Sequence, residues 1–502
     1  MARRSTGPFS GPVQAAVVAT RPAHAPPLPP GAAPDRQPER SAVKTGLVLF
    51  GVVLAFYLSA PNVTNTDAYL AVPTAVSLVH SANLNLDEFR SPLVKDHYGY
   101  VALNGQHFDR YPWTDSLFFV PGVVVVDVLH RVGLAPGATN LVESNRMGPL
   151  QLVTASVVTA LAAVVVFALA LELLGGPPLR RRRTSLVVGL VFALATSAWS
   201  TASRALWQHG PSMLALALAL VAASRLERGY RPRRMAVLLG VAVAAAYAIR
   251  PTNVIAVVAF GAFVAFGHRR WLGAYLSGVA GVLGPFAAVN VASFGRLLPP
   301  YYSAGRISLH PAYLEALAAN LFSPARGLFV FCPIVGLGVA GFVLQVRARR
   351  VRSLEVVVAA CVVAQLLLVS AQNEGWWAGH AFGPRFMSDV LPMLVYLSIP
   401  AVEALHGALR SGAPTLLSKV AVAGTGLAVV CGVAVNAEGA YLRSSTCWNA
   451  EPVSIDLRPS RVWDMHDPQV LAGFRAMARN GPWAAMVGPC PGAAGVAARS
   501  QS

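Results

Sequence analysis

Long apolar runs alternate with short polar segments along nearly the whole chain. From residue 42 onward, runs of about 15 to 25 uncharged residues are separated by segments that carry charge, glycine or proline. Runs of this length are typical of helices that cross the roughly 30 Å hydrocarbon core of a bilayer. The pattern predicts an all-α polytopic membrane protein. The expected spans are about 42–60, 146–173, 185–203, 211–225, 235–249, 252–267, 271–294, 327–346, 354–371, 389–408 and 416–435, eleven in all.

Three segments fall outside this pattern. Residues 1–42 are rich in Pro, Ala and Arg without apolar periodicity, which predicts a disordered basic arm. The polar segment 61–145 is too long for a turn and is expected to form the first outer loop. Within it, Thr114–His130 is apolar but holds two acids and a Pro-Gly pair, so we expect a re-entrant or interfacial helix there.

Composition and charge agree with a membrane protein. The chain is 55% hydrophobic and 12% charged, and its mean hydropathy is +0.53, which excludes a soluble class. The net charge of +18 does not predict a nucleic-acid partner, because the basic residues fall in short clusters between apolar runs. Five alternate loops hold 17 Lys or Arg, against six in the other loops after residue 146.

By the positive-inside rule, the five loops rich in Lys and Arg are expected to lie on the cytoplasmic side. We expect a multi-pass protein of the cell (inner or plasma) membrane, with the lipid bilayer as a partner. Its N-terminus is expected to be cytoplasmic, and its tail, residues 436–502, extracytoplasmic and folded back onto the outer loops. Cys447 and Cys490 in this tail are expected to pair in an oxidising compartment. The closed loop would reduce the chain entropy of the unfolded state and so stabilise the folded protein by about 3–4 kcal/mol.

The stretch Gln372–Asp389 is a polar and aromatic island between two apolar runs. Polar groups at membrane depth are costly unless they face water, a cavity or a ligand, so the island is a candidate site; the alternative is an aromatic belt with ordinary turn residues. The same topology puts further polar segments on the outer side, where one pocket would collect them. These are Asn65–Asp67, Tyr111–Trp113, Arg204–Pro211, Arg250–Asn253 and Ser323–Gly327. The loop Gly295–Arg326 is expected to cover that pocket.

With these features the chain resembles the polyprenyl-phosphate-sugar-dependent integral membrane glycosyltransferases of the GT-C fold, such as protein O-mannosyltransferases and lipid A aminoarabinose transferases. The resemblance covers most of residues 43–470. It rests on an acid soon after the first span (Asp67), on the long first outer loop with Tyr111-Pro112-Trp113, and on outward arginines between short spans. Members often carry an acidic pair where this chain has Thr66-Asp67. The resemblance implies a GT-C-like fold, a polyprenyl-phosphate sugar donor and an extracytoplasmic glycan, lipid or protein acceptor.

The implied reaction assigns roles to particular residues. In an inverting transfer an acceptor hydroxyl attacks the anomeric carbon while polyprenyl phosphate leaves, which requires a carboxylate base and cations beside the phosphate. Asp67 is the candidate base; alternatively it caps a helix over Ala68–His80. Glu374 is a second acid that would bind a divalent cation with Asp67, although no ligand spacing predicts a metal site. The candidates for binding the donor phosphate and sugar are Arg204, Arg250, Arg385, His209, His380, Trp207, Trp376, Trp377, Glu374 and Tyr111.

Each of these candidates has a structural alternative. Arginines at span ends snorkel to the interface, a lone histidine near a helix end is often structural, and tryptophans anchor membrane proteins at the interface. Three functional alternatives also stay open. A transporter or flippase of polyprenyl-linked glycans is expected to show internal repeats with broken helices, and none is convincing here. A polysaccharide polymerase or ligase of related helical fold would also use a lipid-linked donor, but its large outer loop usually comes late in the chain, whereas here the long loop comes first. The third alternative is a noncatalytic membrane scaffold.

Overall fold

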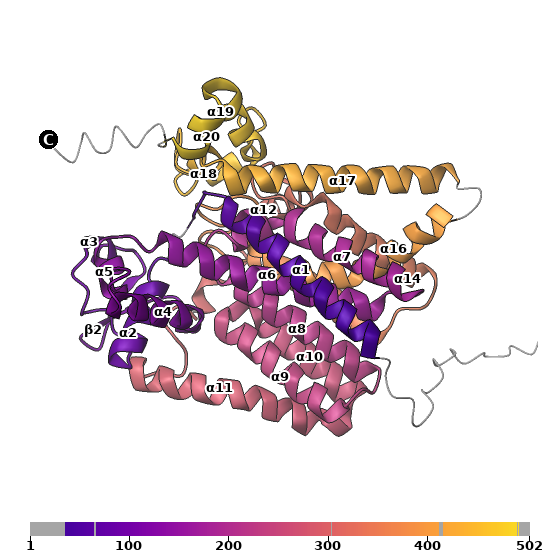
Figure 1. The fold of residues 1–502 in the computed structure, drawn as a ribbon, viewed down its shortest axis with the longest axis horizontal. Helices are drawn as coiled ribbons and strands as arrows, with labels where there is room; N and C mark the ends of the chain where they lie inside the picture. Colours follow the sequence, from indigo (N-terminus) through magenta and orange to yellow (C-terminus); the bar gives the residue numbers. More distant parts are fainter. Residues whose placement is uncertain (1–35, 65–66, 303, 411–414, 489, 491–502) are drawn as a thin grey trace, which may run out of the picture.

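The structure is a computed structural model that describes residues 36–64, 67–302, 304–410, 415–488 and 490. Within these residues, eight helices are long and apolar enough to cross a membrane, and two shorter apolar helices accompany them. The chain is therefore an all-α, multi-pass membrane protein. Figure 1 shows the long helices running side by side along the longest axis of the molecule.

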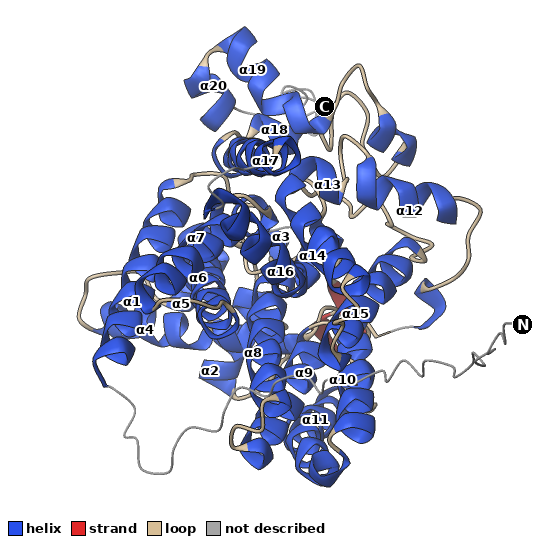
Figure 2. Cartoon of the chain, turned by 90° about the vertical axis from the view of Figure 1, so that its right-hand side faces the viewer, coloured by secondary structure: helices blue, strands red, loops and turns tan. Residues whose placement is uncertain are grey.

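Eleven helices overlap the eleven predicted spans. They are α1 (Arg36–Ser59), α6 (Gly148–Leu173), α7 (Pro178–Leu194), α8 (His209–Glu227), α9 (Pro232–Ile249), α10 (Val254–Gly267), α11 (Leu272–Phe294), α14 (Gly336–Arg347), α15 (Ser353–Ser370), α16 (Leu391–Arg410) and α17 (Leu416–Tyr441). Both views place α11 and α17 on opposite sides of the bundle (Figures 1 and 2).

Several predicted helix boundaries are wrong, among them the start of α14, which lies at Gly336 instead of residue 327. The helix α1 begins at Arg36, inside the expected arm. The helix α17 continues to Tyr441, so the tail begins later than residue 436. The helix α7 begins at Pro178, which puts four arginines in its first turns rather than in a loop, and it ends at Leu194 instead of residue 203.

The early end of α7 has a local cause. After it, the hydroxyl of Thr196 donates to the carbonyl of Phe192 (2.6 Å) and also accepts from the amide of Ala198 (3.3 Å). Such side-chain bonds compete with the helical pattern of backbone bonds. The chain then passes through the π-helical turn η2 (Ala198–Ala202) before α8.

The first predicted outer loop folds into a small layer at one end of the bundle, which we call the loop end. It contains α2 (Ala71–Ser81), α3 (Pro92–Lys95), β1 (Tyr100–Leu103), β2 (Gln106–Asp109), η1 (Trp113–Phe118), α4 (Val120–Arg131) and α5 (Ala138–Glu143). The strands pair antiparallel, with Tyr100 opposite Asp109. The indole of Trp113 donates to Asn290 (2.9 Å) and the hydroxyl of Thr114 to the carbonyl of Ala248 (2.7 Å), which fixes η1 against α11 and α9.

The tail packs beside the C-terminal end of α17 (Figure 1). Its elements are α18 (Ser444–Cys447), η8 (Pro459–Trp463), η9 (Gln469–Leu471), α19 (Ala472–Asn480) and α20 (Pro482–Val487). Cys447 and Cys490 form the predicted disulfide, with their Cα atoms 5.4 Å apart. The buried Arg326, which precedes α13 (Leu328–Phe331), donates to the side chains of Gln469 and Asn449 in the tail. The tail is thus folded back onto the loop that carries Arg326, as predicted.

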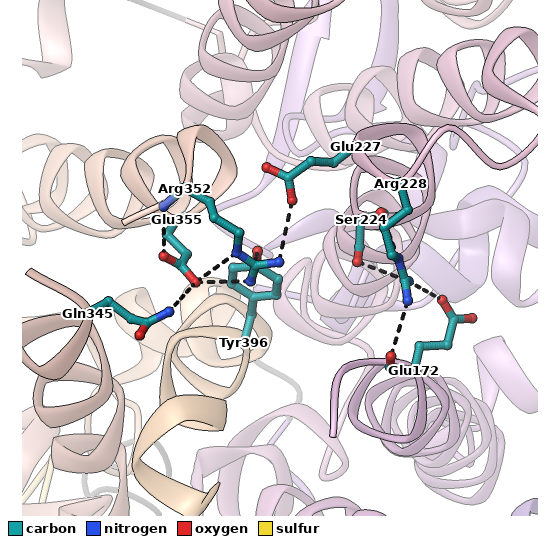
Figure 3. Close-up of polar contacts among 8 residues, drawn as sticks. All are labelled: Glu172, Ser224, Glu227, Arg228, Gln345, Arg352, Glu355 and Tyr396. Atoms are coloured by element: carbon teal, nitrogen blue, oxygen red, sulfur yellow. Dashed lines mark hydrogen bonds and ion pairs between the residues drawn. The ribbon is translucent and has the colours of Figure 1, made fainter. Parts of the chain in front are cut away.

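The opposite end of the bundle is held by ion pairs (Figure 3). Arg228 at the end of α8 binds Glu172 of α6 (2.8 Å). Arg352, before α15, binds Glu355 (2.9 Å), and its Nη1 lies 3.6 Å from Glu227 of α8. These contacts join the ends of α6, α8 and α15, and they use arginines that the sequence assigned to the inner side.

Candidate functional site

An ion pair between distant parts of the chain marks the loop end. Asp67, soon after α1, accepts a hydrogen bond from Nη1 of Arg385 (2.8 Å), the first residue of η7 (Arg385–Val390). The hydroxyl of Tyr98 also donates to Asp67. The ring of Trp207 lies 4.3 Å from the guanidinium carbon of Arg385. Three of the predicted site residues, Asp67, Arg385 and Trp207, are therefore brought together.

A second buried pair lies beside the first. Arg250, directly after α9, forms an ion pair with Asp389 of η7, and His209, the first residue of α8, lies 2.8 Å from the other oxygen of Asp389. The ring of Phe386 packs against both arginines, 5.4 Å from the guanidinium carbon of Arg250 and 5.1 Å from that of Arg385. Two charge pairs thus share one short helix.

The sequence before η7 explains how that helix is presented. Gly383 has φ +70°, in the left-handed region that favours glycine, and a Cβ there would lie 2.6 Å from the ring of Phe331. Pro384 follows and starts the 3-10 turn. The Gly-Pro pair of the island therefore turns the chain so that Arg385, Phe386 and Asp389 all point into the site.

A cavity of about 380 Å³ opens beside these pairs. Three guanidinium groups and two carboxylates line it, together with an apolar wall. The charged residues are Asp67, Arg250, Arg306, Glu374 and Arg385, and the apolar wall includes Val254, Leu298, Ile307 and Leu368. A cavity with this lining can hold an anionic group at its polar side and a hydrocarbon chain at its apolar side.

Arg306 was not among the predicted site residues. It belongs to η5 (Ala304–Arg306), and its guanidinium carbon lies 5.1 Å from the ring centre of Tyr301. Its segment belongs to the loop that was expected to cover the pocket, and Tyr301, Tyr302 and Ile307 of that loop do line the cavity. The position of Arg306 in a predicted outer loop is the sequence signal that could have identified it.

A smaller cavity of about 30 Å³ adjoins the larger one. Six residues border both: Asp67, Tyr111, Arg250, Tyr301, Arg385 and Phe386. The small cavity is also lined by Trp207, His209 and two buried carboxyl groups, Asp109 and Asp115. Sequence reasoning assigned neither acid to the site, although Asp115 was noticed as an acid within an apolar segment.

The carboxyl groups outside the spans differ in their pKa values. Burial by itself would raise the pKa of Asp67, but the charge of Arg385 and the hydrogen bonds from Tyr98 and Arg385 outweigh it and hold that pKa below its ordinary value. Burial raises the pKa of Asp109 to about 8. Burial, and then the nearby charges of Asp109 and Asp389, raise the pKa of Asp115 well above its ordinary value. The site therefore combines Asp67, whose charged form is favoured, with Asp109 and Asp115, whose neutral forms are favoured.

One predicted phosphate ligand is not brought to the site. Arg204 is fully buried, and its guanidinium donates to the carbonyls of Ala60 (2.7 Å) and Tyr57 (2.5 Å). It also contacts the hydroxyl of Ser203. These carbonyls belong to the last turn of α1 and to the residue after it. A cation at the C-terminal end of a helix interacts favourably with the helix dipole. Arg204 lines neither cavity, and it is buried rather than snorkelling to the interface.

Three predicted residues of the island hold the tail instead. Trp376 is buried in an apolar cluster with Trp448. The indole of Trp377 donates to Asp456 (2.7 Å), and Nε2 of His380 lies 3.2 Å from the same carboxylate. None of the three lines either cavity. The remaining candidates, Arg250, His209, Glu374 and Tyr111, do line one or both.

Two further expectations concern neighbouring residues and metals. Asn65 and Thr66, which precede the candidate base, lie outside the described residues. Across the described part of the chain, no group of three or more His, Cys, Asp or Glu is placed to hold a metal ion.

Comparison of the chain with protein-family models, with curated proteins and with solved structures gives no match. The resemblance to the GT-C class therefore stays a prediction from the sequence.

Proposed function

We propose that the chain is an inverting glycosyltransferase with eleven spans and a GT-C-like fold, whose loop end faces the outside of the cell membrane. It would move a sugar from a polyprenyl-phosphate donor to a glycan, lipid or protein acceptor of the cell envelope. The observation that carries this proposal is the Asp67–Arg385 pair at the border of the two cavities. It sets a carboxylate base beside a cation for a leaving phosphate.

The larger cavity suits the donor. A phosphodiester needs cations that stay charged in a low dielectric, and guanidinium groups meet that need. Arg250, Arg306 and Arg385 supply them. The apolar side chains of Val254 and Leu368 line the same cavity, and they belong to α10 and α15, which we take as spans. The phosphate then lies at the arginines while the prenyl chain leaves past these helices.

Asp67 acts as the general base. It takes the proton of the acceptor hydroxyl, the hydroxyl oxygen forms a bond to the anomeric carbon, and the bond from that carbon to the phosphate oxygen breaks. The phosphate oxygen keeps the electron pair and is stabilised by the arginines. The attack comes from the face opposite the phosphate, which inverts the anomeric configuration.

Donor binding would also activate the base. Arg385 holds the pKa of Asp67 low in the free protein, and a carboxylate with a low pKa is a weak base. A phosphate that binds Arg385 competes with Asp67 for the positive charge of the guanidinium group. The pKa of Asp67 then rises toward neutrality at the moment when a base is needed.

The test is transfer of radiolabelled sugar from a panel of polyprenyl-phosphate sugars by the purified protein, with an envelope fraction as acceptor. We expect Asp67→Asn to lower the rate by about 10²- to 10⁴-fold. The matched control is Asp127→Asn, because Asp127 lies in the same predicted outer loop but lines neither cavity. Full activity of Asp67→Asn contradicts the proposal, and lipid movement across vesicles without transfer favours the flippase alternative.

A further inference from the structure

The small cavity contains an unusual set of unsatisfied polar atoms. Three of the side chains that line it have a buried nitrogen or oxygen with no hydrogen-bond partner among the described residues: Oδ1 of Asp115, Nε1 of Trp207 and Nε of Arg385. Asp115 is 4% exposed and Trp207 is 3% exposed. Leaving a buried polar group unpaired costs about 1–3 kcal/mol, so three such atoms at one cavity point to a group that would satisfy them.

The charges around the cavity select a neutral group. Asp67 is paired with Arg385, and Asp389 with Arg250, so these four charges compensate one another. A further anion in this cavity would lie against Asp67 with no free cation to balance it. A further cation would displace one of the existing arginines. A hydroxyl group can both donate and accept hydrogen bonds without adding charge.

The size of the cavity limits that group. Its volume is about 30 Å³, and one water molecule needs roughly 10–15 Å³ on the same measure. The space therefore admits one hydroxyl or hydroxymethyl group and not a phosphate or a whole sugar ring. The larger cavity next to it has room for both of those.

We propose that the small cavity is a specificity subsite that receives one hydroxyl or hydroxymethyl group of the donor sugar, with Asp115 as its hydrogen-bond partner. This inference rests on the proposed function, because it places the phosphate at the arginines of the larger cavity. The two cavities share Asp67, Tyr111 and Arg385 at their border, so a sugar bound to that phosphate reaches the subsite. Burial favours the protonated form of Asp115, which can donate a hydrogen bond as well as accept one.

Binding measurements separate this role from a general effect on folding. The purified protein is titrated with two probes, bare decaprenyl phosphate and decaprenyl phosphate carrying the best sugar of the panel. We expect Asp115→Leu to weaken binding of the sugar-bearing lipid by about tenfold and to leave binding of the bare lipid unchanged. Asp115→Asn keeps a donor and an acceptor in place, so we expect it to restore most of the affinity.

Three results would overturn the subsite. Equal losses for both lipids would mean that Asp115 supports the fold or the phosphate site, and no loss for either would mean that it contacts nothing. A wild-type protein that binds both lipids equally well would also contradict the proposal. Sugar-specific binding that depends on Asp115, without any transfer, would leave the subsite standing and remove the transferase proposal instead.

Discussion

Asp67 and Asp389 each neutralise one arginine of the site, and this pairing governs how the site responds to a ligand. A buried arginine that already has a carboxylate partner gives up part of that interaction when a phosphate binds. Arg306, by contrast, packs on Tyr301 at the edge of the larger cavity. We therefore expect Arg306 to supply much of the net attraction for an anionic headgroup, and Arg385 to link that headgroup to the base.

At the scale of single residues, the buried acid Asp109 predicts a pH dependence of stability. Its pKa is about 8 in the folded protein against 3.8 ordinarily, because burial disfavours the carboxylate. Between these values the folded protein holds a proton that the unfolded chain releases. The free energy of unfolding therefore falls as pH rises through this window, by at most about 1.4 kcal/mol per pH unit.

Asp109→Asn removes this contribution, so its melting temperature in detergent should fall less between pH 5 and pH 8 than that of the wild type. Asp115 has a raised pKa too, and its share of the slope remains in the variant. Asp96→Asn, at an exposed carboxyl, is the control and should keep the wild-type slope. An unchanged slope in Asp109→Asn would rule out the buried, protonated state described above.

Sequence reasoning identified some site residues and missed others because the packing of each side chain cannot be seen in the sequence. Arg204 and Arg385 look alike in the sequence, since both are arginines in polar segments between apolar runs. Only the packing shows that Arg204 caps α1 while Arg385 reaches Asp67. Asp389 was the last residue of the predicted island, and its pairing with Arg250 depends on η7, a short 3-10 helix that no apolar periodicity reveals.

At the scale of elements, α9, the helix that Arg250 follows, packs closely against α11. A Cβ at Gly240 would lie 2.1 Å from the carbonyl oxygen of Tyr275, and one at Gly278 would lie 2.2 Å from that of Val237. The two backbones therefore touch, as small residues allow between helices in a membrane. The apolar runs predicted both helices, but they did not predict which faces meet.

Gly278→Ala should destabilise the protein by about 1–3 kcal/mol, because the added methyl has to push α9 away from α11. Gly281→Ala on the same helix is the matched control, since a Cβ there meets nothing within 4 Å. It should be neutral or slightly stabilising through its better helix propensity. Thermal unfolding of both variants in one detergent makes the comparison, and equal stability of the two would contradict the contact.

At the scale of the whole molecule, the structure has the long apolar helices of a multi-pass membrane protein, as the sequence predicts. The apolar runs gave the helices because a span must satisfy its own backbone hydrogen bonds. They also placed several polar segments at one pocket, but not the side chains within those segments that reach it, because that depends on how the helices pack. Six residues of the island line a cavity, namely Gln372, Glu374, Gly375, Gly379, Arg385 and Phe386. Trp377 and His380 contact Asp456 of the tail instead.

The most direct test of the central claim is a structure of the protein in lipid nanodiscs with saturating polyprenyl phosphate. The phosphate should lie in the larger cavity, within hydrogen-bond distance of at least two of Arg250, Arg306 and Arg385, and the prenyl chain should leave past Val254 and Leu368. A phosphate bound at the opposite end of the bundle, beside Arg228 and Arg352, or an empty cavity at saturating lipid, would contradict the assignment of this site.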